Sequence, residues 1–420
     1  MKLHDYQGRL RVNGLSFDEI AERYGTPFYL YDLDSVRERI DAVKQAFGGA
    51  AELLYAVKAN PNRELLRGIR NHVDGLDIAS GGELGLALDA GYHVASVSFA
   101  GPGKTADELR KAVRGGVGII SVESMRELRQ LRDIAEEENI RVPVTMRVNP
   151  AFAIKEFAVK MGGRASQFGV DEEDLGEAAG YLRENNRFFD TLGIHIYAGT
   201  QCLSEEALAR GLSETLRIAI DMREQHGIEC RVINVGGGFG VSYYEEGRAL
   251  DLALLSSLYH EAFERYRRAT GTGPRFLLEL GRYLVATAGI YVARVVSEKR
   301  SRGEQFYVLD GGMNHHLAAS GNLGATLRKN YLVRNLSRPG EEKETCNLVG
   351  PLCTPLDLMG KGVAVESPEV GDLVGFLNSG SYGYSASPLL FLGHEPPKEI
   401  VLSGGVLMDG SFYAAPPAED

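Results

Sequence analysis

The chain has 420 residues, of which 44% are apolar and 25% are charged, and its net charge is −11. A single core stops growing at about 250–300 residues, so this length predicts two domains. The negative charge argues against nucleic acid and anionic membrane surfaces as partners. No apolar run approaches the roughly 18 residues of a membrane span, and the N-terminus lacks the apolar segment of a signal peptide, so we expect a cytoplasmic protein. Neither a disulfide framework nor a zinc site is indicated by the four cysteines, Cys202, Cys230, Cys346 and Cys353.

Eight short apolar segments have the pattern of buried parallel strands, and helical patterns separate them. They lie at 53–59, 75–81, 95–101, 118–124, 143–149, 192–199, 232–238 and 275–282. An S/T-x-x-E spacing starts the expected helix after the second segment, at Ser80, and after the fourth, at Ser124. Eight strand–helix repeats predict a closed (β/α)8 barrel, which we place at residues 34–284.

The pattern changes after Leu284. Short strands with turn residues follow, such as "GIYVARVVSEK" and "DLVGFLNSG", with almost no long helix. This texture predicts an antiparallel β-barrel or sandwich. The stretch "TPFYLYD" precedes the first barrel repeat, so we expect residues 1–33 to complete a β domain with residues 285–420.

Chemistry in such a barrel lies at the carboxyl ends of its strands. The residues at the expected strand ends are mostly polar or glycine: Lys58, Asp77, Ser80, Arg147, Asn149, His195, Tyr197, Thr200, Gly236, Gly237, Gly238, Glu279 and Arg282. One lysine, several acids and a glycine-rich turn should therefore meet on one face.

Three of these features fit a phosphate-bearing aromatic cofactor. Consecutive glycines from Gly236 let backbone N–H groups approach an anion closely. Glu279 could keep a ring nitrogen protonated, and a lysine at position 58, desolvated by apolar neighbours, would lose its proton more readily and attack an aldehyde. Together they indicate pyridoxal phosphate. Each alone has an ordinary structural explanation, as a paired lysine, a tight turn or a salt-bridged strand end.

The chain also resembles a known family. The motifs "YAVKANPN", "DIASGGEL", "SQFGV", "GGGFG", "ELGR", "DGGMN", "GPLCTPLD" and "SGSYGYS" follow in the order typical of barrel-type (fold type III) pyridoxal phosphate-dependent decarboxylases. This group contains the diaminopimelate, ornithine and arginine decarboxylases. The resemblance extends from about Thr26 to about Leu402.

The resemblance implies a role for each matching residue. Lys58 would bind the cofactor aldehyde covalently, and Glu279 would contact the pyridine nitrogen. The phosphate would be surrounded by Gly236 to Gly238, Arg282 and Tyr382, with Thr200 where the family often has serine. Tyr197 would stand in for the ring-stacking histidine, and Asp77 and His195 complete the cofactor-binding set. Cys353 would return a proton to the substrate across the interface of a head-to-tail homodimer with shared active sites.

Two departures from the family bear on the substrate. Thr354 replaces the acid that follows the cysteine in diamino acid decarboxylases, so a distal ammonium would lack a charge partner. Ala318 replaces the arginine that holds the distal carboxylate of diaminopimelate, so that group would lack a guanidinium. We place Thr354, Ala318 and His315 on the substrate side of the site.

A substrate without a free distal charge meets both conditions, and a glutamyl thioester on a carrier protein is one. The segment "MNHHLAASGNLG" resembles the branch that contains glutamyl-carrier-protein and exosortase-associated decarboxylases. An acyl or peptidyl carrier protein is acidic and would need a basic surface, for which the candidates are Arg328, Lys329, Arg334 and Arg338.

Three alternatives remain open. A conventional diaminopimelate- or ornithine-type decarboxylase would keep the same motifs. A racemase on this fold would share Lys58, but it would not explain "GPLCTPLD". A noncatalytic regulator could retain the fold and the cofactor, although the joint presence of Lys58, Glu279 and Cys353 argues against it.

Overall fold

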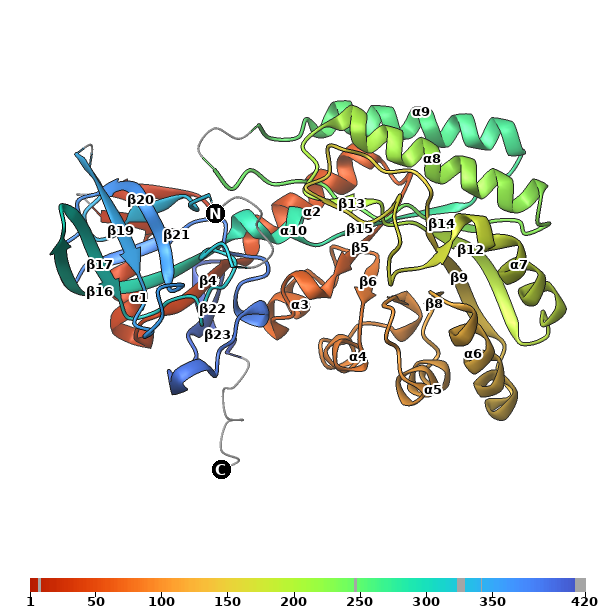
Figure 1. The fold of residues 1–420 in the computed structure, drawn as a ribbon, viewed down its shortest axis with the longest axis horizontal. Helices are drawn as coiled ribbons and strands as arrows, with labels where there is room; N and C mark the ends of the chain where they lie inside the picture. Colours follow the sequence, from red (N-terminus) through yellow and green to blue (C-terminus); the bar gives the residue numbers. More distant parts are fainter. Residues whose placement is uncertain (7–8, 245–247, 323–328, 341, 412–420) are drawn as a thin grey trace.

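A barrel surrounded by helices and a body rich in β-strands lie side by side along the longest axis of the molecule (Figure 1). The computed structural model describes residues 1–6, 9–244, 248–322, 329–340 and 342–411. Eight parallel strands pair in the order β9-β12-β14-β15-β5-β6-β7-β8, and β8 pairs again with β9. The ring is therefore closed, which confirms the predicted (β/α)8 architecture.

The barrel elements alternate along the chain. Its strands are β5 (Glu52–Ala56), β6 (Gly75–Ile78), β7 (Val97–Phe99), β8 (Ile119–Val122), β9 (Val142–Asn149), β12 (Phe189–His195), β14 (Val232–Asn234) and β15 (Arg275–Leu280). The helices on its outside are α2 (Leu33–Phe47), α3 (Arg63–Ile69), α4 (Gly81–Asp89), α5 (Ala106–Gly115), α6 (Met125–Glu138), α7 (Leu175–Glu184), α8 (Glu205–Glu224) and α9 (Leu252–Thr270). Short strands β10 (Val159–Lys160), β11 (Val170–Asp171) and β13 (Gly199–Thr200) extend the loops at the rim.

The second body is a sheet built from both ends of the chain. Strand β4 (Phe28–Asp32) lies between β16 (Gly289–Ser301) and β22 (Lys398–Ser403). The other members are β17 (Glu304–Leu309), β18 (Val333–Asn335), β19 (Lys343–Val349), β20 (Leu358–Glu366), β21 (Leu373–Phe376) and β23 (Val406–Asp409). Most pairings are antiparallel, as predicted, but β4–β22 and β17–β19 are parallel. The domain boundaries expected at residues 33 and 285 stay a prediction.

The remaining elements flank this sheet. Strands β1 (Leu3–Tyr6), β2 (Arg9–Val12) and β3 (Leu15–Ser16) form a separate small sheet, followed by helix α1 (Phe17–Tyr24). Helix α10 (Arg282–Val285) follows the last barrel strand. All four cysteines are free thiols. Among the described residues, no helix has the length and apolar character that crossing a membrane needs.

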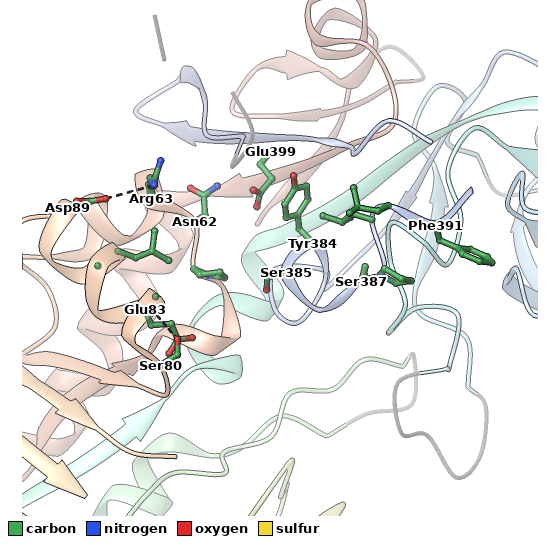
Figure 2. A pocket seen from close by; sticks show the side chains of 17 residues that line it. Asn62, Arg63, Ser80, Glu83, Asp89, Tyr384, Ser385, Ser387, Phe391 and Glu399 are labelled. Carbon is green, nitrogen blue, oxygen red and sulfur yellow. Dashed lines mark hydrogen bonds and ion pairs between the residues drawn. The ribbon is translucent and has the colours of Figure 1, made fainter. Parts of the chain in front are cut away.

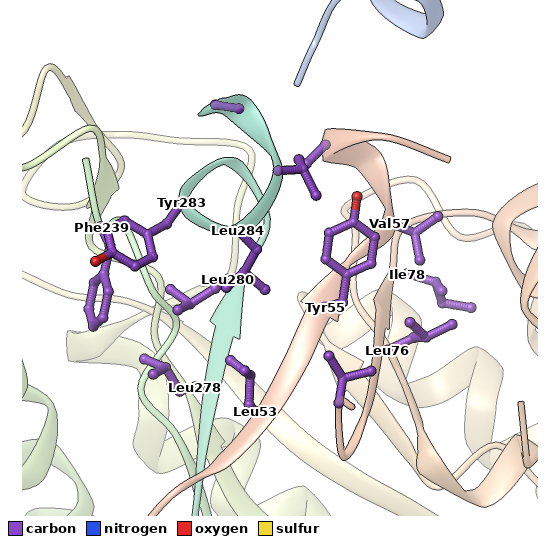
Figure 3. Close-up of a cluster of buried hydrophobic side chains, with 14 of the residues drawn as sticks. Leu53, Tyr55, Val57, Leu76, Ile78, Phe239, Leu278, Leu280, Tyr283 and Leu284 are labelled. Atoms are coloured by element: carbon purple, nitrogen blue, oxygen red, sulfur yellow. The ribbon is translucent and has the colours of Figure 1, made fainter. Parts of the chain in front are cut away.

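Along each barrel strand, side chains that face the surrounding helices alternate with side chains that face the barrel interior. Leu53 and Tyr55 on β5, Leu76 and Ile78 on β6 and Leu278 and Leu280 on β15 pack under the helices in one buried cluster (Figure 3). The intervening positions face the barrel interior, where Leu54, Ile119, Leu192, Val232 and Leu277 form a separate apolar layer. A strand that is buried on both faces is a continuous run of apolar residues, so it can be recognised from the sequence.

All but one of the barrel strands end earlier than predicted; the exception is β9, which ends at Asn149 as expected. Lys58 was expected inside the first strand, but β5 ends at Ala56 and Lys58 lies in the 3-10 turn Val57–Ala59. Strand β14 ends at Asn234 because Gly236 (φ 64°) and Gly238 (φ 86°) adopt left-handed conformations. The side chains at the rim are therefore carried by tight turns that directly follow rigid strands.

The expected helix starts are present, with one difference. Ser80 accepts a hydrogen bond from the Glu83 backbone N–H (3.2 Å), as a capping box requires. The Glu83 carboxylate, however, accepts from the N–H of Ala79 (2.6 Å) and not from that of Ser80. This bond holds Glu83 against the end of β6, close to Asp77.

Candidate active site

The inward positions of the barrel strands change from apolar to polar near their carboxyl ends. Because side chains of alternate residues share a face, Leu277 and Glu279 both point inward on β15, as do Val232 and Asn234 on β14. The apolar layer at the bottom thus supports a polar layer directly above it. This layering places the site where a (β/α)8 barrel carries its chemistry.

Lys58 is surrounded by carboxylates. Its Nζ donates to Asp77 Oδ2 at 2.8 Å, and the Asp77 side chain is 1% exposed, whereas that of Lys58 is 45% exposed and can be reached from outside. Burial lowers the pKa of Lys58, but Asp77 and Glu279 outweigh it and raise the pKa above its ordinary value. The prediction that a dry environment keeps this amine uncharged is therefore wrong, because two buried anions favour the ammonium.

Glu279 is held as an anion. Asn234 Nδ2 donates to Glu279 Oε1, and His195 Nε2 lies 3.3 Å from Glu279 Oε2. Ser121 Oγ, 2.8 Å from His195 Nδ1, fixes the other side of the imidazole ring. Burial raises the pKa of Glu279, but His195, Lys58 and Asn234 outweigh it and hold the pKa well below its usual range. A fixed carboxylate that stays ionised can accept a hydrogen bond from a protonated ring nitrogen.

The glycine turn packs tightly against the backbone of Glu279. A Cβ on Gly237 would overlap the carbonyl oxygen of Glu279, and one on Gly238 would overlap the carbonyl oxygen of Gly199. Glycine is therefore required for the close approach as well as for the positive φ angles of Gly236 and Gly238. Backbone N–H groups in such a turn are suited to bind an anion.

Arg282 provides a cation beside the turn. Its Nη1 donates to the Tyr243 hydroxyl at 2.9 Å, and its guanidinium lies 4.5 Å from the centroid of the Tyr382 ring. Its Nε is buried without a hydrogen-bond partner. The cavity is lined by Ala56, Lys58, Tyr197, Thr200, Gly238, Phe239, Glu279, Leu280, Gly281, Arg282, Tyr283 and Tyr382.

These residues fit pyridoxal phosphate. The cavity brings together an amine on Lys58, an ionised carboxylate on Glu279 and, at the glycine turn, the unsatisfied donor of Arg282. They match the aldehyde, the ring nitrogen and the phosphate of that cofactor. Asp77 Oδ1 is also buried without a partner. Four of the predicted cofactor-binding residues do not line the cavity: Asp77, His195, Gly236 and Gly237. Asp77 and His195 contact Lys58 and Glu279, and the two glycines precede Gly238 in the turn.

The four residues expected to catalyse protonation or contact the substrate lie elsewhere in this chain. Cys353, Thr354, His315 and Ala318 are not among the described residues that line the cavity, and Cys353 is exposed. They occur on two loops, "DGGMNHHLA" and "GPLCTPLD", that pack against each other. The structure thus brings these residues into a second group, separate from Lys58.

Asp357, which the sequence reasoning gave no role, joins the two loops. Its carboxylate accepts from the N–H of Met313 (2.7 Å) and of Leu352 (2.8 Å), and it is 3% exposed. A Cβ on Gly312 or Gly350 would overlap the same carboxylate. The only sequence signal was the aspartate at the end of "GPLCTPLD". Asp357 therefore sets the position of the loop that carries Cys353.

The predicted basic surface is largely neutralised. Arg334 Nε donates to Glu366 Oε1 at 2.5 Å, and Arg338 Nη2 donates to Asp372 Oδ2 at 2.7 Å. Lys329 Nζ lies 5.0 Å from the Tyr244 ring centroid, and Arg328 lies outside the described residues. Because Arg334 and Arg338 are both paired with carboxylates, neither provides free positive charge. The sequence showed the cations, but it did not indicate which carboxylates would pair with them.

Acid should weaken the fold through a buried histidine. Ala319 N–H donates to Nδ1 of His316 (3.3 Å), so Nε2 carries the proton and faces Ser379 Oγ at 2.8 Å. Burial lowers the His316 pKa to about 3. Because an unfolded histidine titrates near 6.5, the unfolded chain binds more protons between these values. The free energy of unfolding should fall as pH drops from about 6.5, by up to about 1.4 kcal/mol per unit.

Urea unfolding of the wild type and of His316→Gln between pH 5 and pH 7 measures this effect. The variant should show a shallower dependence on pH, and His4→Gln, at an exposed position, should retain the wild-type slope. Equal slopes for the wild type and His316→Gln would contradict the assignment.

Known proteins are similar to this chain in sequence and in fold. The family model described as "Pyridoxal-dependent decarboxylase, pyridoxal binding domain" matches residues 33–286. An L-glutamyl-[BtrI acyl-carrier protein] decarboxylase from Niallia circulans is 39% identical over 390 residues, which cover 92% of this chain and 91% of that protein. A diaminopimelate decarboxylase from Campylobacter jejuni is 30% identical over 375 residues, 89% of this chain and 90% of that protein.

Solved structures of diaminopimelate decarboxylases superpose on this chain. The diaminopimelate decarboxylase of M. jannaschii in complex with L-lysine superposes with a TM-score of 0.89 at 25% identity, covering 97% of this chain and 94% of that one. The enzyme from Helicobacter pylori, also with L-lysine, has a TM-score of 0.85 at 28% identity, with coverage of 94% and 96%. With its lysine, carboxylate and glycine turn placed as described, the chain belongs to the pyridoxal phosphate-dependent decarboxylases of the ornithine, arginine and diaminopimelate group.

Proposed function

We propose that this decarboxylase acts on a glutamyl group joined through its side-chain carboxyl to an acyl carrier protein. The observation that carries the proposal is the lack of charge among the predicted substrate contacts. Thr354 and Ala318 are neutral, and burial lowers the pKa of His315 to about 4, so that it too is uncharged near pH 7. The relative from Niallia circulans, named for a glutamyl-carrier substrate, supports the same choice.

Each residue of the cavity has a distinct task in this reaction. Pyridoxal phosphate, when bound, supplies an electron sink for the pair released from the Cα–carboxyl bond. Lys58 would hold the cofactor aldehyde, and Glu279 would keep the ring nitrogen protonated. Gly236 to Gly238, Thr200, Arg282 and Tyr382 would surround the phosphate, and Tyr197 would pack against the ring. Cys353 delivers a proton to Cα after carbon dioxide leaves.

Cys353 acts across a dimer interface in this proposal. It is exposed, it does not line the Lys58 cavity of its own chain, and it belongs to a loop whose position Asp357 fixes. A head-to-tail homodimer would place the loop of one subunit over the cavity of the other, so that each site is completed by both chains. The cytoplasmic location expected from the sequence stays a prediction.

Carbon dioxide release from matched substrates tests the proposal. The wild type should act on a γ-glutamyl thioester of an acyl carrier protein and should be much slower with free glutamate, diaminopimelate, ornithine, lysine and arginine. Faster turnover of diaminopimelate would favour the conventional activity of the 30% identical relatives. Bound cofactor with no release from any of these substrates would favour a noncatalytic regulator.

Replacing Glu279 with glutamine should slow decarboxylation on the order of 10²–10³-fold, because the neutral amide no longer stabilises a protonated ring nitrogen. Cofactor retention should change far less, since Lys58 and the glycine turn are unaltered. Carbon dioxide release and the visible absorbance of the bound cofactor are measured on the same preparation. A variant with wild-type turnover would remove Glu279 from the mechanism.

A further inference from the structure

A second, larger cleft opens beside the Lys58 cavity. It has a volume of about 940 Å³ and lies between the start of helices α3 and α4 on the barrel and segment 384–391 of the β domain (Figure 2). Its barrel wall is formed by residues 61–63 and by α4, including Gly82 and Gly85. Pockets of this size accommodate ligands much larger than a single amino acid.

The cleft lies next to the active site. Two of its walls begin a few residues beyond residues that line the cavity, since Pro61 follows Lys58 and Tyr384 follows Tyr382, and a third begins at Ser80, shortly after Asp77, the partner of Lys58. Glu83, on the barrel wall, is close enough to Asp77 and Lys58 to interact with both charges. The barrel wall of the cleft is therefore adjacent to Lys58, within reach of a chain attached to a substrate bound there.

The charged side chains that line the cleft already have partners. Arg63 lies 3.8 Å from Asp89, Glu83 accepts from the N–H of Ala79, and Glu399 accepts from the hydroxyl of Tyr31 at 3.0 Å. An ionic ligand would have to break these contacts, whereas an uncharged one would not.

The opposite wall presents apolar surface. Leu390 is 80% exposed and Phe391 is 43% exposed, and both line the cleft beside serines 385 and 387. Apolar groups with a few hydroxyls suit a chain of methylenes and amides.

We infer that this cleft binds the pantetheine arm through which the carrier protein presents the glutamyl group. The arm is extended, contains amides and, beyond its terminal phosphate, carries no charge, so it suits the volume of the cleft and walls whose charged side chains already have partners. The inference rests on the proposed function, and it assigns a subsite that recognises the arm independently of the carrier protein.

Gly85→Phe tests the subsite by filling it. Gly85 is exposed on α4, and a Cβ at this position meets no atom within 4 Å, so the larger side chain enters the cleft without displacing the helix. Gly180 on α7 is a matched control, because its Cβ also meets nothing within 4 Å and it does not line the cleft. Leu390→Asp, on the opposite wall, adds a charge at an exposed position, where the substitution should not impair folding.

The measured quantity is kcat/KM for two γ-glutamyl thioesters, one of pantetheine and one of the shorter N-acetylcysteamine. The wild type and Gly180→Phe should prefer the pantetheine thioester, and Gly85→Phe and Leu390→Asp should lose on the order of tenfold of that preference. Preferences equal to that of the wild type in both cleft variants would overturn the subsite while the proposed function stands. A wild type that processes the carrier-protein thioester but neither of these two would overturn the subsite alone, and one that processes none of the three would overturn both.

The oligomeric state of the same variants distinguishes a competing occupant. Sedimentation should give the same assembly for the wild type, Gly85→Phe and Leu390→Asp. If Leu390→Asp dissociates the assembly, the cleft is an interface between copies of this chain and the inference is wrong.

Discussion

Replacing Lys58 with arginine is expected to reduce carbon dioxide release by roughly 10³-fold or more while the chain stays folded. Arginine keeps the positive charge between Asp77 and Glu279, but it does not deprotonate and cannot condense with an aldehyde. Lys58→Ala should be equally inactive and also less stable, because it leaves two buried carboxylates without their cation. The difference between the variants separates the role of the charge from that of the amine.

Three measurements check this expectation: carbon dioxide release, labelling of the protein after borohydride reduction, and urea unfolding. Neither variant should be labelled at position 58, and only the alanine variant should unfold at a lower urea concentration than the wild type. Because Lys58 is 45% exposed, the loss of stability should be smaller than for a fully buried ion pair. Labelling or turnover in Lys58→Arg would show that another amine holds the cofactor.

The architecture could be predicted because the barrel strands are buried on both faces. Leu277 and Leu278 lie in different cores, yet both are apolar, so the strand reads as an uninterrupted run. The ends of the strands were placed too late because the rim turns are equally buried. Val57 is fully buried in its 3-10 turn, and only the backbone conformation distinguishes it from a strand residue.

The identity of the cavity residues was also accessible from sequence, since Lys58, Glu279 and Arg282 each lie at or near the carboxyl end of a predicted strand. Their electrostatics were not. The charge state of Lys58 depends on Asp77 and Glu279, which are distant in sequence and meet it only in the closed barrel. In the same way, the contact between Arg282 and Tyr243 joins the start of helix α10 to a loop, and no local pattern indicates that these two segments are close.

A mixed dimer should recover activity that neither parent has. If Cys353 serves the neighbouring subunit, a heterodimer of Lys58→Arg and Cys353→Ala chains has one site with both changes and one site with neither. The purified heterodimer should therefore show about half of the wild-type activity. Each parent homodimer should be impaired, the Cys353→Ala form by on the order of 10²–10⁴-fold through loss of its general acid.

A second heterodimer provides the control, because Lys58 and Glu279 line the same cavity of one chain. Pairing Lys58→Arg with Glu279→Gln leaves one change in each site, so activity should stay at the level of the impaired parents. Two differently tagged chains, purified through both tags and assayed for carbon dioxide release, allow the comparison. Recovery in the control pair would contradict the placement of Lys58 and Glu279 in one cavity. No recovery in the Cys353 pair would place the cysteine over the cavity of its own chain, and the exposed loop held by Asp357 would then have to move toward Lys58 within one subunit.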